Sequence, residues 1–570
     1  FFSSRRRHTR SFHVTGVQTC ALPISRLGVW GKRLGEGPER QLPDGTMYQP
    51  ATRQRTGEPE LADGLITQEC WCSKTTEHSR QEAHGTEFWE QPNTAIEIEI
   101  QNPDSKRQWS SFVNDFSGYF VGALKRRAIE VNEKKLSVED QRKFAEAKQI
   151  EVKNYVAAKA FEALPPDRRP PPEVAIKMRW LLTWKRCDDG SSKAKARAIL
   201  LGYQDPSYEE RETTSPVMTR QARQFVLTAA ARFGWLVQKG DVTGAFLQGR
   251  KYPQELYCIP VDEICHAMGL DAGSITRVRK GCYGLVDAPL EWYRTISELL
   301  DSLGLVKSWS DPCCWMWKPG GVLKGLISGH VDDFLFAGSK DDPEWVALTT
   351  KIRDHFKWTD WEQNSFVQCG VKVEVQPDGS YHLSQPEYVE KIPEIYLNAS
   401  RKKEHDQPTT DREKTMLRAT LGALSWFAQQ TAPHISAEVS LLLSEVATSS
   451  VEVIHRTNKL VHFAKSRKDH KMVIHAIPPH VPIGFFTWCD AAGQNRKDGS
   501  RTQGILVGLG PMNLLEGEVS KVIPISWHSN KIEKQCKSPG AAEGRAAVAG
   551  EDYMYHARFQ IGRASCRERV

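Results

Sequence analysis

A short acidic tip between two apolar runs constrains the fold of this chain most. Residues 326–330 lead into Asp332 and Asp333, and the apolar run 334–337 follows at once. Each run is too short for a stable helix, and a polar break of two or three residues between such runs is typical of a β-hairpin. The pattern therefore predicts a strand, a tight acidic turn and a second strand.

A second acid ends another apolar run about ninety residues earlier. Residues 235–237 continue through 238–240 into Asp241, and residues 242–247 follow. Adjacent carboxylates in an apolar frame repel each other and have raised pKa values unless a cation lies between them, so a divalent metal is a natural partner. Each site taken alone is more simply an ordinary Asp-containing turn, and both interpretations stay open at this point.

The composition excludes a single small fold and wholesale disorder. The 570 residues allow three or four domains of about 150 residues each. With 39% hydrophobic residues and 17 tryptophans, the chain can bury sizeable cores. Apolar runs stay well below the roughly 18 residues of a transmembrane helix, so we expect a soluble protein without a membrane partner.

The net charge of +7 is concentrated at the two ends. Residues 1–25 contain four arginines and no acid, and residues 561–570 contain three arginines and one glutamate, so the ends account for +6 of the total. The strings in residues 3–10, 14–24 and 561–570 resemble translated sequencing-adapter DNA. We therefore expect both ends to be artefacts without structure, natural basic tails being the minor alternative.

Cysteine usage favours a reducing compartment. Two of the 13 cysteines lie in the end segments, and the remaining 11 are scattered and odd in number. Cys70 and Cys72 with His78 and His84 suggest zinc only weakly, because the pairs lack CxxC spacing. The chain also lacks a Walker phosphate loop, a Gly-x-Ser-x-Gly elbow and an HExxH helix, which excludes several common enzyme classes.

The sequence of the first third of the chain indicates a largely disordered segment, then a strand and a long helix. Residues 26–92 are rich in Gly, Pro and charge and are predicted to be disordered, whereas strict alternation in 95–100 indicates a strand. Ser137 with Asp140 resembles a capping box at the start of a long helix, which we expect to end before Pro165.

A proline-rich connector and a basic hairpin come next. Residues 165–172 cannot continue a helix and form a stiff connector. The runs 174–184 and 194–201 flank a turn at 188–191, which predicts a hairpin. Its basic residues are Lys177, Arg179, Lys185, Arg186, Lys193, Lys195 and Arg197, opposed by Asp188 and Asp189. Such a surface is usually only solvated, but it also suits phosphate binding.

The order of motifs resembles the reverse transcriptase of copia-type retrotransposons. Residues 195–204 are similar to the family's KARLVAKGYTQ, 214–217 to FSPV, 241–249 to DVKTAFLNG, 283–285 to YGL and 330–333 to YVDD. Together these motifs are highly specific.

The resemblance continues downstream of the acidic tip. Residues 383–385 with Tyr388, and 422–424 with 431–435, are similar to the family's connecting region. The similarity spans about 140–555.

The resemblance implies an α+β fold. We expect a right-hand polymerase with a palm of antiparallel strands backed by helices and a fingers hairpin, then a connection region and an incomplete α/β RNase H-like domain. The expected segments are an artefact at 1–25, disorder at 26–92, a lead-in at 93–172, the reverse transcriptase at 173–400, a connection or thumb-like helical region at 401–480, a truncated RNase H-like domain at 481–560 and an artefact at 561–570.

The implied activity is RNA-directed DNA polymerisation, a nucleotidyl transfer that uses two metal ions. The resemblance makes Asp241, Asp332 and Asp333 the catalytic ligands of two Mg²⁺ ions, or of Mn²⁺ in their place. The implied nucleotide-binding residues are Lys195, Arg197, Phe246 and Tyr283. Phe246 would lie against the sugar, although an apolar residue here is otherwise simply core.

Two departures from the family pattern favour an alternative function without catalysis. His330 replaces the tyrosine of the acidic tip, and residues 286–290 (VDAPL) replace KQAPR, which removes a lysine and an arginine and adds an acid. The alternative is a non-catalytic retroelement relic that still folds and binds nucleic acid.

The C-terminal region resembles the start of a retroelement RNase H. Residues 485–490, 501–507 and 525–529 are similar to its three leading strands, and Glu543 opens the next helix. Asp490 and Glu543 supply two acids of a partial site. The strand for a third would follow Gln560, so we expect no RNase H activity from this chain.

The resemblance also implies partners and a location. The expected partners are an RNA template, a DNA primer, deoxynucleoside triphosphates and other polyprotein products such as integrase and capsid. The expected location is a cytoplasmic virus-like particle with access to the nucleus, since the first residues lack the apolar core of a secretion signal.

Overall fold

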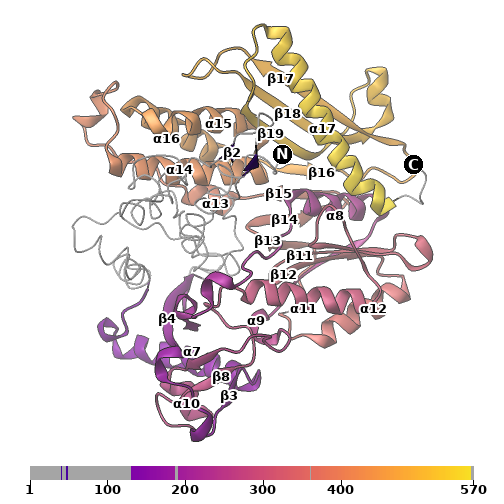
Figure 1. Ribbon diagram of the computed structural model, residues 1–570. Helices are drawn as coiled ribbons and strands as arrows, with labels where there is room; N and C mark the ends of the chain where they lie inside the picture. Colours follow the sequence, from indigo (N-terminus) through magenta and orange to yellow (C-terminus); the bar gives the residue numbers. More distant parts are fainter. Residues whose placement is uncertain (1–39, 42–46, 49–129, 187–190, 360, 566–570) are drawn as a thin grey trace. The chain divides into compact units, whose positions relative to one another are not determined.

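The computed structural model describes residues 40–41, 47–48, 130–186, 191–359 and 361–565 (Figure 1). The expected disorder of 26–92, the expected strand at 95–100 and the weak zinc candidates Cys70, Cys72, His78 and His84 lie outside these residues. The chain divides into two compact units. Unit 1 contains Phe1–Ser215 and Gly244–Ser297, and unit 2 contains Pro216–Thr243 and Glu298–Val570.

Unit 1 begins with the predicted helix, α7 (Val138–Ala157). The hydroxyl of Ser137 caps it and accepts a hydrogen bond from the Asp140 N–H at 3.1 Å, which confirms the predicted start. The helix ends well before Pro165, because the short strand β3 (Phe161–Ala163) follows and pairs with β8 (Thr276–Val278). The connector beyond contains two single 3₁₀ turns, Pro166–Arg168 and Pro172–Val174, since proline is tolerated in a first helical turn.

The basic hairpin of unit 1 is confirmed. β4 (Ile176–Arg186) and β5 (Ser192–Leu200) pair antiparallel from Met178 opposite Leu200 to Arg186 opposite Ser192. They belong to a five-stranded sheet of order β3-β8-β7-β4-β5, in which β7 is Tyr257–Ile259. The other helices that begin in unit 1 are α9 (Ala245–Gln248), α10 (Asp262–Ala267) and α11 (Ala288–Ser302).

The central sheet of unit 2 contains the predicted acidic hairpin. Its order is β6-β12-β11-β10-β9, all pairs being antiparallel. The strands are β6 (Leu236–Asp241), β9 (Val306–Lys307), β10 (Cys314–Trp317), β11 (Gly325–His330) and β12 (Asp333–Gly338). The residues of β11 and β12 are all buried, as their apolar sequence predicts. Helix α8 (Arg220–Phe233) contacts both strands, and α12 (Pro343–His355) follows β12.

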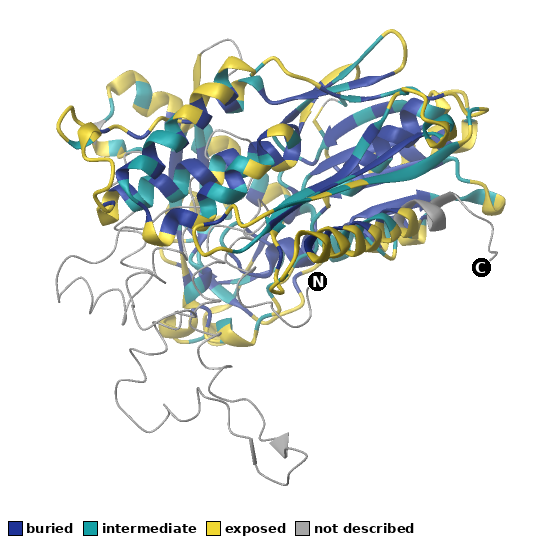
Figure 2. Cartoon of the chain, turned by 90° about the horizontal axis from the view of Figure 1, so that it is seen from above, coloured by how far each residue is buried: buried dark blue, intermediate teal, exposed yellow. Residues whose placement is uncertain are grey.

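A second sheet and a helical region follow in unit 2. The sheet consists of β13 (Ser365–Gln368), β14 (Val371–Val375), β15 (Tyr381–Ser384) and β16 (Met472–Ile474). The helices are α13 (Pro386–Lys391), α14 (Asp411–Gln430), α15 (Ser436–Glu445) and α16 (Val451–Ser466). Buried leucines, isoleucines and valines from these helices form one core. Figure 2 shows the resulting alternation of buried and exposed helix faces.

The last part of unit 2 is a three-stranded antiparallel sheet with one long helix. β17 (Ile483–Ala492), β18 (Thr502–Pro511) and β19 (Ile523–Lys531) contain the three predicted strands. Helix α17 (Pro539–Ser565) contacts β17 and β18, and most of its described side chains are exposed (Figure 2). The expectation of no structure in 561–570 is therefore wrong for 561–565, which belong to α17.

Two chain-wide expectations can be compared with the described part. None of its helices combines the length and the hydropathy that a bilayer-crossing segment requires. The eight cysteines placed in the described ranges all carry free thiols.

Candidate active site

Three of the predicted carboxylates meet where β6 ends beside the β11–β12 hairpin. Asp241, the last residue of β6, is the direct Cα partner of Asp333, the first residue of β12. The N–H of Val242 donates a hydrogen bond of 2.8 Å to the carbonyl of Asp332. The strand register thus joins Asp241, Asp332 and Asp333, although about ninety residues separate the two segments.

The tip of the acidic hairpin carries backbone strain. His330 and Asp333 form the last pair, so Val331 and Asp332 make a two-residue turn. Val331 has a φ of 60°, in the left-handed region that a β-branched residue rarely adopts. Turns of this length normally use Gly, Asn or Asp at such positions. Strain of this kind concentrates at functional sites, and the sequence pattern gave no sign of it.

Asp333 is the buried member of the three. Its side chain is 4% exposed, whereas Asp241 and Asp332 are half-buried. One carboxylate oxygen, Oδ2, accepts a hydrogen bond of 3.1 Å from the Cys369 N–H, and Oδ1 has no hydrogen-bond partner among the described residues. Burial raises the pKa of Asp333 to about 7, against the opposing effect of the Lys239 ammonium.

The chemistry of these residues suits a hard divalent cation. Carboxylate oxygens are the ligands that Mg²⁺ prefers, and the buried Oδ1 of Asp333 has an unused acceptor. Within the described ranges, no group of three or more His, Cys, Asp or Glu side chains is arranged to hold a metal ion. Mg²⁺ commonly takes only one or two protein carboxylates and completes its shell with water and substrate phosphates, so the donor set fits without a full protein cage.

A second segment that the sequence did not reveal lies beside β6. Lys239 forms a β-bridge with Glu362, and Val242 forms one with Trp358. Gly240 is required here, because a Cβ at this position would lie 2.7 Å from Nε1 of Trp361. The contact joins residues more than a hundred positions apart, and single-sequence periodicity has no means of detecting such pairing.

In unit 1 the structure joins three of the four predicted nucleotide-binding residues. The guanidinium of Arg197 lies over the ring of Tyr283, 4.9 Å from its centroid. The ring of Phe246 meets Tyr283 edge-on at 5.3 Å. Lys195 lies two residues before Arg197 on β5 and therefore on the same face of the strand. Phe246 is only 8% exposed, so it is also part of a core.

A buried acid supports this cationic pair. Glu151 on α7 accepts a hydrogen bond of 3.4 Å from the Ala198 N–H. Burial raises the pKa of Glu151, and the nearby Arg197 and Lys195 lower it. Sequence reasoning missed Glu151, whose only signal was an acid on the buried face of a helix. It also overstated the net positive charge of the basic hairpin, because Arg179 forms an ion pair with Glu130.

The departures from the family pattern at 286–290 lie in the interior of unit 1. Val286 and Leu290 are both buried. Asp287 is also buried, and the hydroxyl of Tyr252 lies 3.0 and 2.9 Å from its two carboxylate oxygens and donates its proton there. Burial raises the pKa of Asp287 to about 6. The added acid is thus held against a tyrosine.

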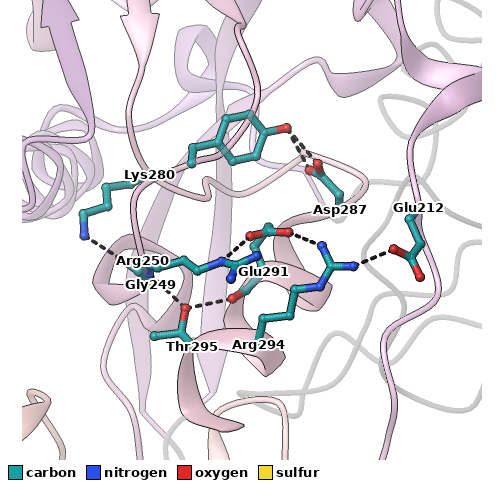
Figure 3. Close-up of polar contacts among 9 residues, drawn as sticks. Glu212, Gly249, Arg250, Lys280, Asp287, Glu291, Arg294 and Thr295 are labelled. Carbon is teal, nitrogen blue, oxygen red and sulfur yellow. Dashed lines mark hydrogen bonds and ion pairs between the residues drawn. The ribbon is translucent and has the colours of Figure 1, made fainter. Parts of the chain in front are cut away.

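A polar network ties the start of α11 to the segment that follows α9 (Figure 3). The carboxylate of Glu291 lies between Arg250, at 2.8 Å, and Arg294, at 2.7 Å, and Arg294 also pairs with Glu212. The backbone N–H of Arg250 donates to the hydroxyl of Thr295 at 2.9 Å. These contacts hold the residues just after α9, which carries Phe246, against the first turns of α11, which follows Asp287.

Asp490 and Glu543 lie on different elements, β17 and α17. A Cβ at Gly550 of α17 would lie 2.1 Å from Sγ of Cys489 and 2.9 Å from the methyl group of Thr487, so α17 covers the face of β17 that carries these two side chains. Asp490 is the next residue of the strand, is exposed and belongs to the opposite face. Glu543 lies on α17, near enough to Cys489 to raise the pKa of that thiol further than burial alone does.

Comparison with known proteins identifies the class to which the central region is similar. Residues 163–402 match the family model of reverse transcriptase, an RNA-dependent DNA polymerase. This range includes both aspartate segments and the cluster of Arg197, Phe246 and Tyr283.

Three relatives extend the similarity. The chain is 27% identical over 413 residues to the retrovirus-related Pol polyprotein from transposon RE1 of Arabidopsis thaliana, which covers 70% of this chain and 26% of that protein. It is 26% identical over 417 residues to the one from transposon RE2 of the same plant, covering 70% and 27%. It is 27% identical over 316 residues to the one from transposon TNT 1-94 of Nicotiana tabacum, covering 54% and 23%.

The chain thus spans about a quarter of the length of the curated relatives it matches. The matches support a fragment of a retrotransposon Pol polyprotein with a reverse transcriptase domain. They also agree with the mixed helices and antiparallel sheets of the described chain.

Proposed function

We propose that this chain is an RNA-directed DNA polymerase of a copia-type retrotransposon, in which unit 2 contributes the palm and unit 1 the fingers. The observation that carries the proposal is the register of β6 and β12, which pairs Asp241 with Asp333 beside the strained turn of Asp332. The reverse transcriptase match over residues 163–402 supports the same assignment.

Asp241 and Asp332 would hold the catalytic cations, with Asp333 as the buried residue behind them. When bound, two Mg²⁺ ions would lower the pKa of the primer 3′-hydroxyl and neutralise the triphosphate and the leaving pyrophosphate. The protein needs no nucleophile of its own in this reaction. Its contribution is to fix the carboxylates through the β6–β12 pairing and the Cys369 N–H contact.

Lys195 and Arg197 would bind the triphosphate of the incoming nucleotide. The stacking of Arg197 on Tyr283 holds the guanidinium in place, and the buried Glu151 fixes the strand beneath it. Phe246 would pack against the sugar and exclude a 2′-hydroxyl. RNA template, DNA primer and deoxynucleoside triphosphates are then the substrates, with other polyprotein products as partners in a cytoplasmic particle.

The C-terminal sheet with α17 would be an RNase H-like element that does not cleave RNA. Asp490 lies on the face of β17 opposite to the one that α17, which carries Glu543, covers, and a two-metal site needs its acids together.

We also propose that residues 1–25 and 561–570 are translated adapter sequence. A chain reduced to residues 26–560 should melt within about 1 °C of the full chain, because chain ends seldom carry core packing. A much larger drop would show that the ends are real structure.

Primer extension on an RNA template tests the proposal. The full chain with Mg²⁺, a poly(rA) template and an oligo(dT) primer should incorporate deoxythymidine, and chelation should stop it. Binding of the primer–template without extension would instead favour the alternative of a non-catalytic relic. Absence of both would overturn either function.

A further inference from the structure

Lys239 lies on the acidic face of β6. It precedes Asp241 by two residues, so the pleat directs both side chains to the same side of the sheet. Its direct partner on β12 is Leu335, two residues after Asp333, which makes Lys239 and Asp333 diagonal neighbours. The Lys239 side chain is only 11% exposed. A lysine buried to this extent needs nearby negative charge.

The structure holds this lysine in place through Glu362. The Nζ atom of Lys239 lies 3.1 Å from Oε1 of Glu362. The two backbones also pair, with N–H to O distances of 2.9 Å from Lys239 to Glu362 and 2.8 Å in the reverse direction. Two hydrogen bonds therefore fix the backbone at Lys239, and one ion pair holds its ammonium group.

Three carboxylates act on the charge of the Lys239 ammonium group. Burial lowers the pKa of Lys239, but Asp333, Glu362 and Asp241 together raise it above its ordinary value. Arg223 on α8, another cation on which Asp333 acts, is fully buried and donates to Oε1 of Gln430 at 2.7 Å. The charge of Lys239 thus acts on both Asp241 and Asp333.

We propose that Lys239 is a positioning residue that places a resident positive charge beside the acidic site. The charge balances Asp241 and Asp333 when no metal is bound and repels an arriving divalent cation. Glu362 tunes this effect, since it neutralises part of the lysine charge. The inference rests on the proposed function, because it concerns the same aspartates.

The expected effects of two substitutions have opposite signs. Lys239→Gln removes the repelling charge and should tighten divalent-metal binding on the order of tenfold. Glu362→Gln removes one of the carboxylates that offset the lysine charge and should weaken binding severalfold. Lys239→Arg keeps the charge and should bind as the wild type does. Lys351→Gln removes an exposed lysine of α12 and serves as the matched control.

Mn²⁺ binding to the full chain without nucleic acid is the first measurement, made by isothermal titration calorimetry. The second is the Mg²⁺ concentration that gives half-maximal primer extension, which should shift in the same direction in each variant. Melting curves in EDTA show whether each variant folds. Because Glu362 is half-exposed, Glu362→Gln keeps the test available if Lys239→Gln does not fold.

The outcomes separate this inference from the proposed function. Wild type that binds no Mn²⁺ would overturn the metal site and this inference with it. Wild type that binds Mn²⁺, with both variants unchanged within twofold, would overturn the role of Lys239 alone. Weaker binding in both variants would show that Lys239 acts only by maintaining the fold, and would also overturn the role.

Discussion

The central sheet and the C-terminal sheet of unit 2 both carry an acidic residue near the end of a strand, but they arrange these acids differently. At the end of β6, Asp241 is the direct partner of Asp333, and both side chains project from one face of the sheet. At the end of β17, Asp490 faces away from the helix that carries Glu543. The first arrangement concentrates negative charge, and the second separates it.

The difference shows how register builds a site. In the central sheet, backbone hydrogen bonds between neighbouring strands fix which residues oppose each other, so two acids that pair must share a face. In the C-terminal sheet, the site depends on which face the helix covers, and a shift of one residue along β17 would move its acid to the other face.

The largest expected effect is the loss of catalysis on removing the acid at the hairpin tip. Asp332→Asn should lower primer extension on the order of 10²–10³-fold or more, because it removes a group that stabilises transition-state charge. The melting temperature should stay near that of the wild type, since Asp332 lies in a half-buried turn. Rates of single-nucleotide extension and a melting curve measure both quantities.

Asp341→Asn is the matched control, because Asp341 is an exposed acid just beyond β12. It should extend primers at the wild-type rate. If Asp332→Asn keeps more than about a tenth of the wild-type rate of Mg²⁺-dependent synthesis, the acids of the central sheet are structural. The difference between the two sheets would then have no catalytic meaning.

Next in size is a pH effect at an acid whose pKa is perturbed mainly by burial. The pKa of Asp287 is about 6 in the folded chain, against 3.8 ordinarily. Because the folded pKa is raised, its stabilising effect is fully present below pH 3.8 and is lost as pH rises through 6. Asp287→Asn keeps the neutral form and should gain about 3 kcal/mol relative to wild type between pH 3.8 and 7.

Urea unfolding at pH 4 and pH 7 measures this difference, with the exposed Asp271→Asn as control. A constant difference between variant and wild type at both pH values would show that Tyr252 stabilises the ionised carboxylate enough to cancel the burial effect. Asp287 is an acid raised in pKa mainly by burial. The result therefore shows how much burial alone can raise a carboxyl pKa, without the neighbouring acids that the central sheet has.

The sequence predicted the strands around the acids but not what holds them. Apolar runs and their polar breaks were sufficient for β6, for the β11–β12 hairpin and for the basic hairpin, because these depend on local pattern. The bridge between Lys239 and Glu362, the contact of the Cys369 N–H with Asp333 and the positive φ of Val331 depend on tertiary pairing. Such contacts leave no periodic trace in a single sequence.

The same limit applies to where a helix stops and to which face of a sheet a helix covers. Helix α7 stops at Ala157 because β3 pairs with β8, which lies more than a hundred residues away. The partial site of Asp490 and Glu543 was predicted from resemblance alone, and the choice of the face covered by α17 is a packing outcome. The residue types predicted that carboxylates for a metal site were present. Only the fold decided which of these carboxylates lie on the same face of a sheet.

A smaller effect is expected from the aromatic residue beside Tyr283. Phe246→Val should raise ribonucleotide incorporation relative to deoxyribonucleotide incorporation about tenfold, because it opens space at the sugar 2′ position. Phe246 is also buried, so the variant should lose roughly 2–4 kcal/mol of stability. Competitive incorporation on one template measures the ratio. The exposed Phe233→Val is the control, and an unchanged ratio in a destabilised Phe246→Val protein would assign Phe246 to the core alone.

The smallest expected effect belongs to the separated acids. Asp490→Asn should change primer extension by less than twofold and stability by at most about 0.5 kcal/mol, because Asp490 is exposed and lies on the face opposite α17. Cleavage of an RNA–DNA hybrid should stay at background in wild type, Asp490→Asn and Glu543→Gln alike. Cleavage by the wild type that either substitution abolishes would mean that β17 and α17 bring both acids to one metal site, and the distinction between the two sheets would no longer hold.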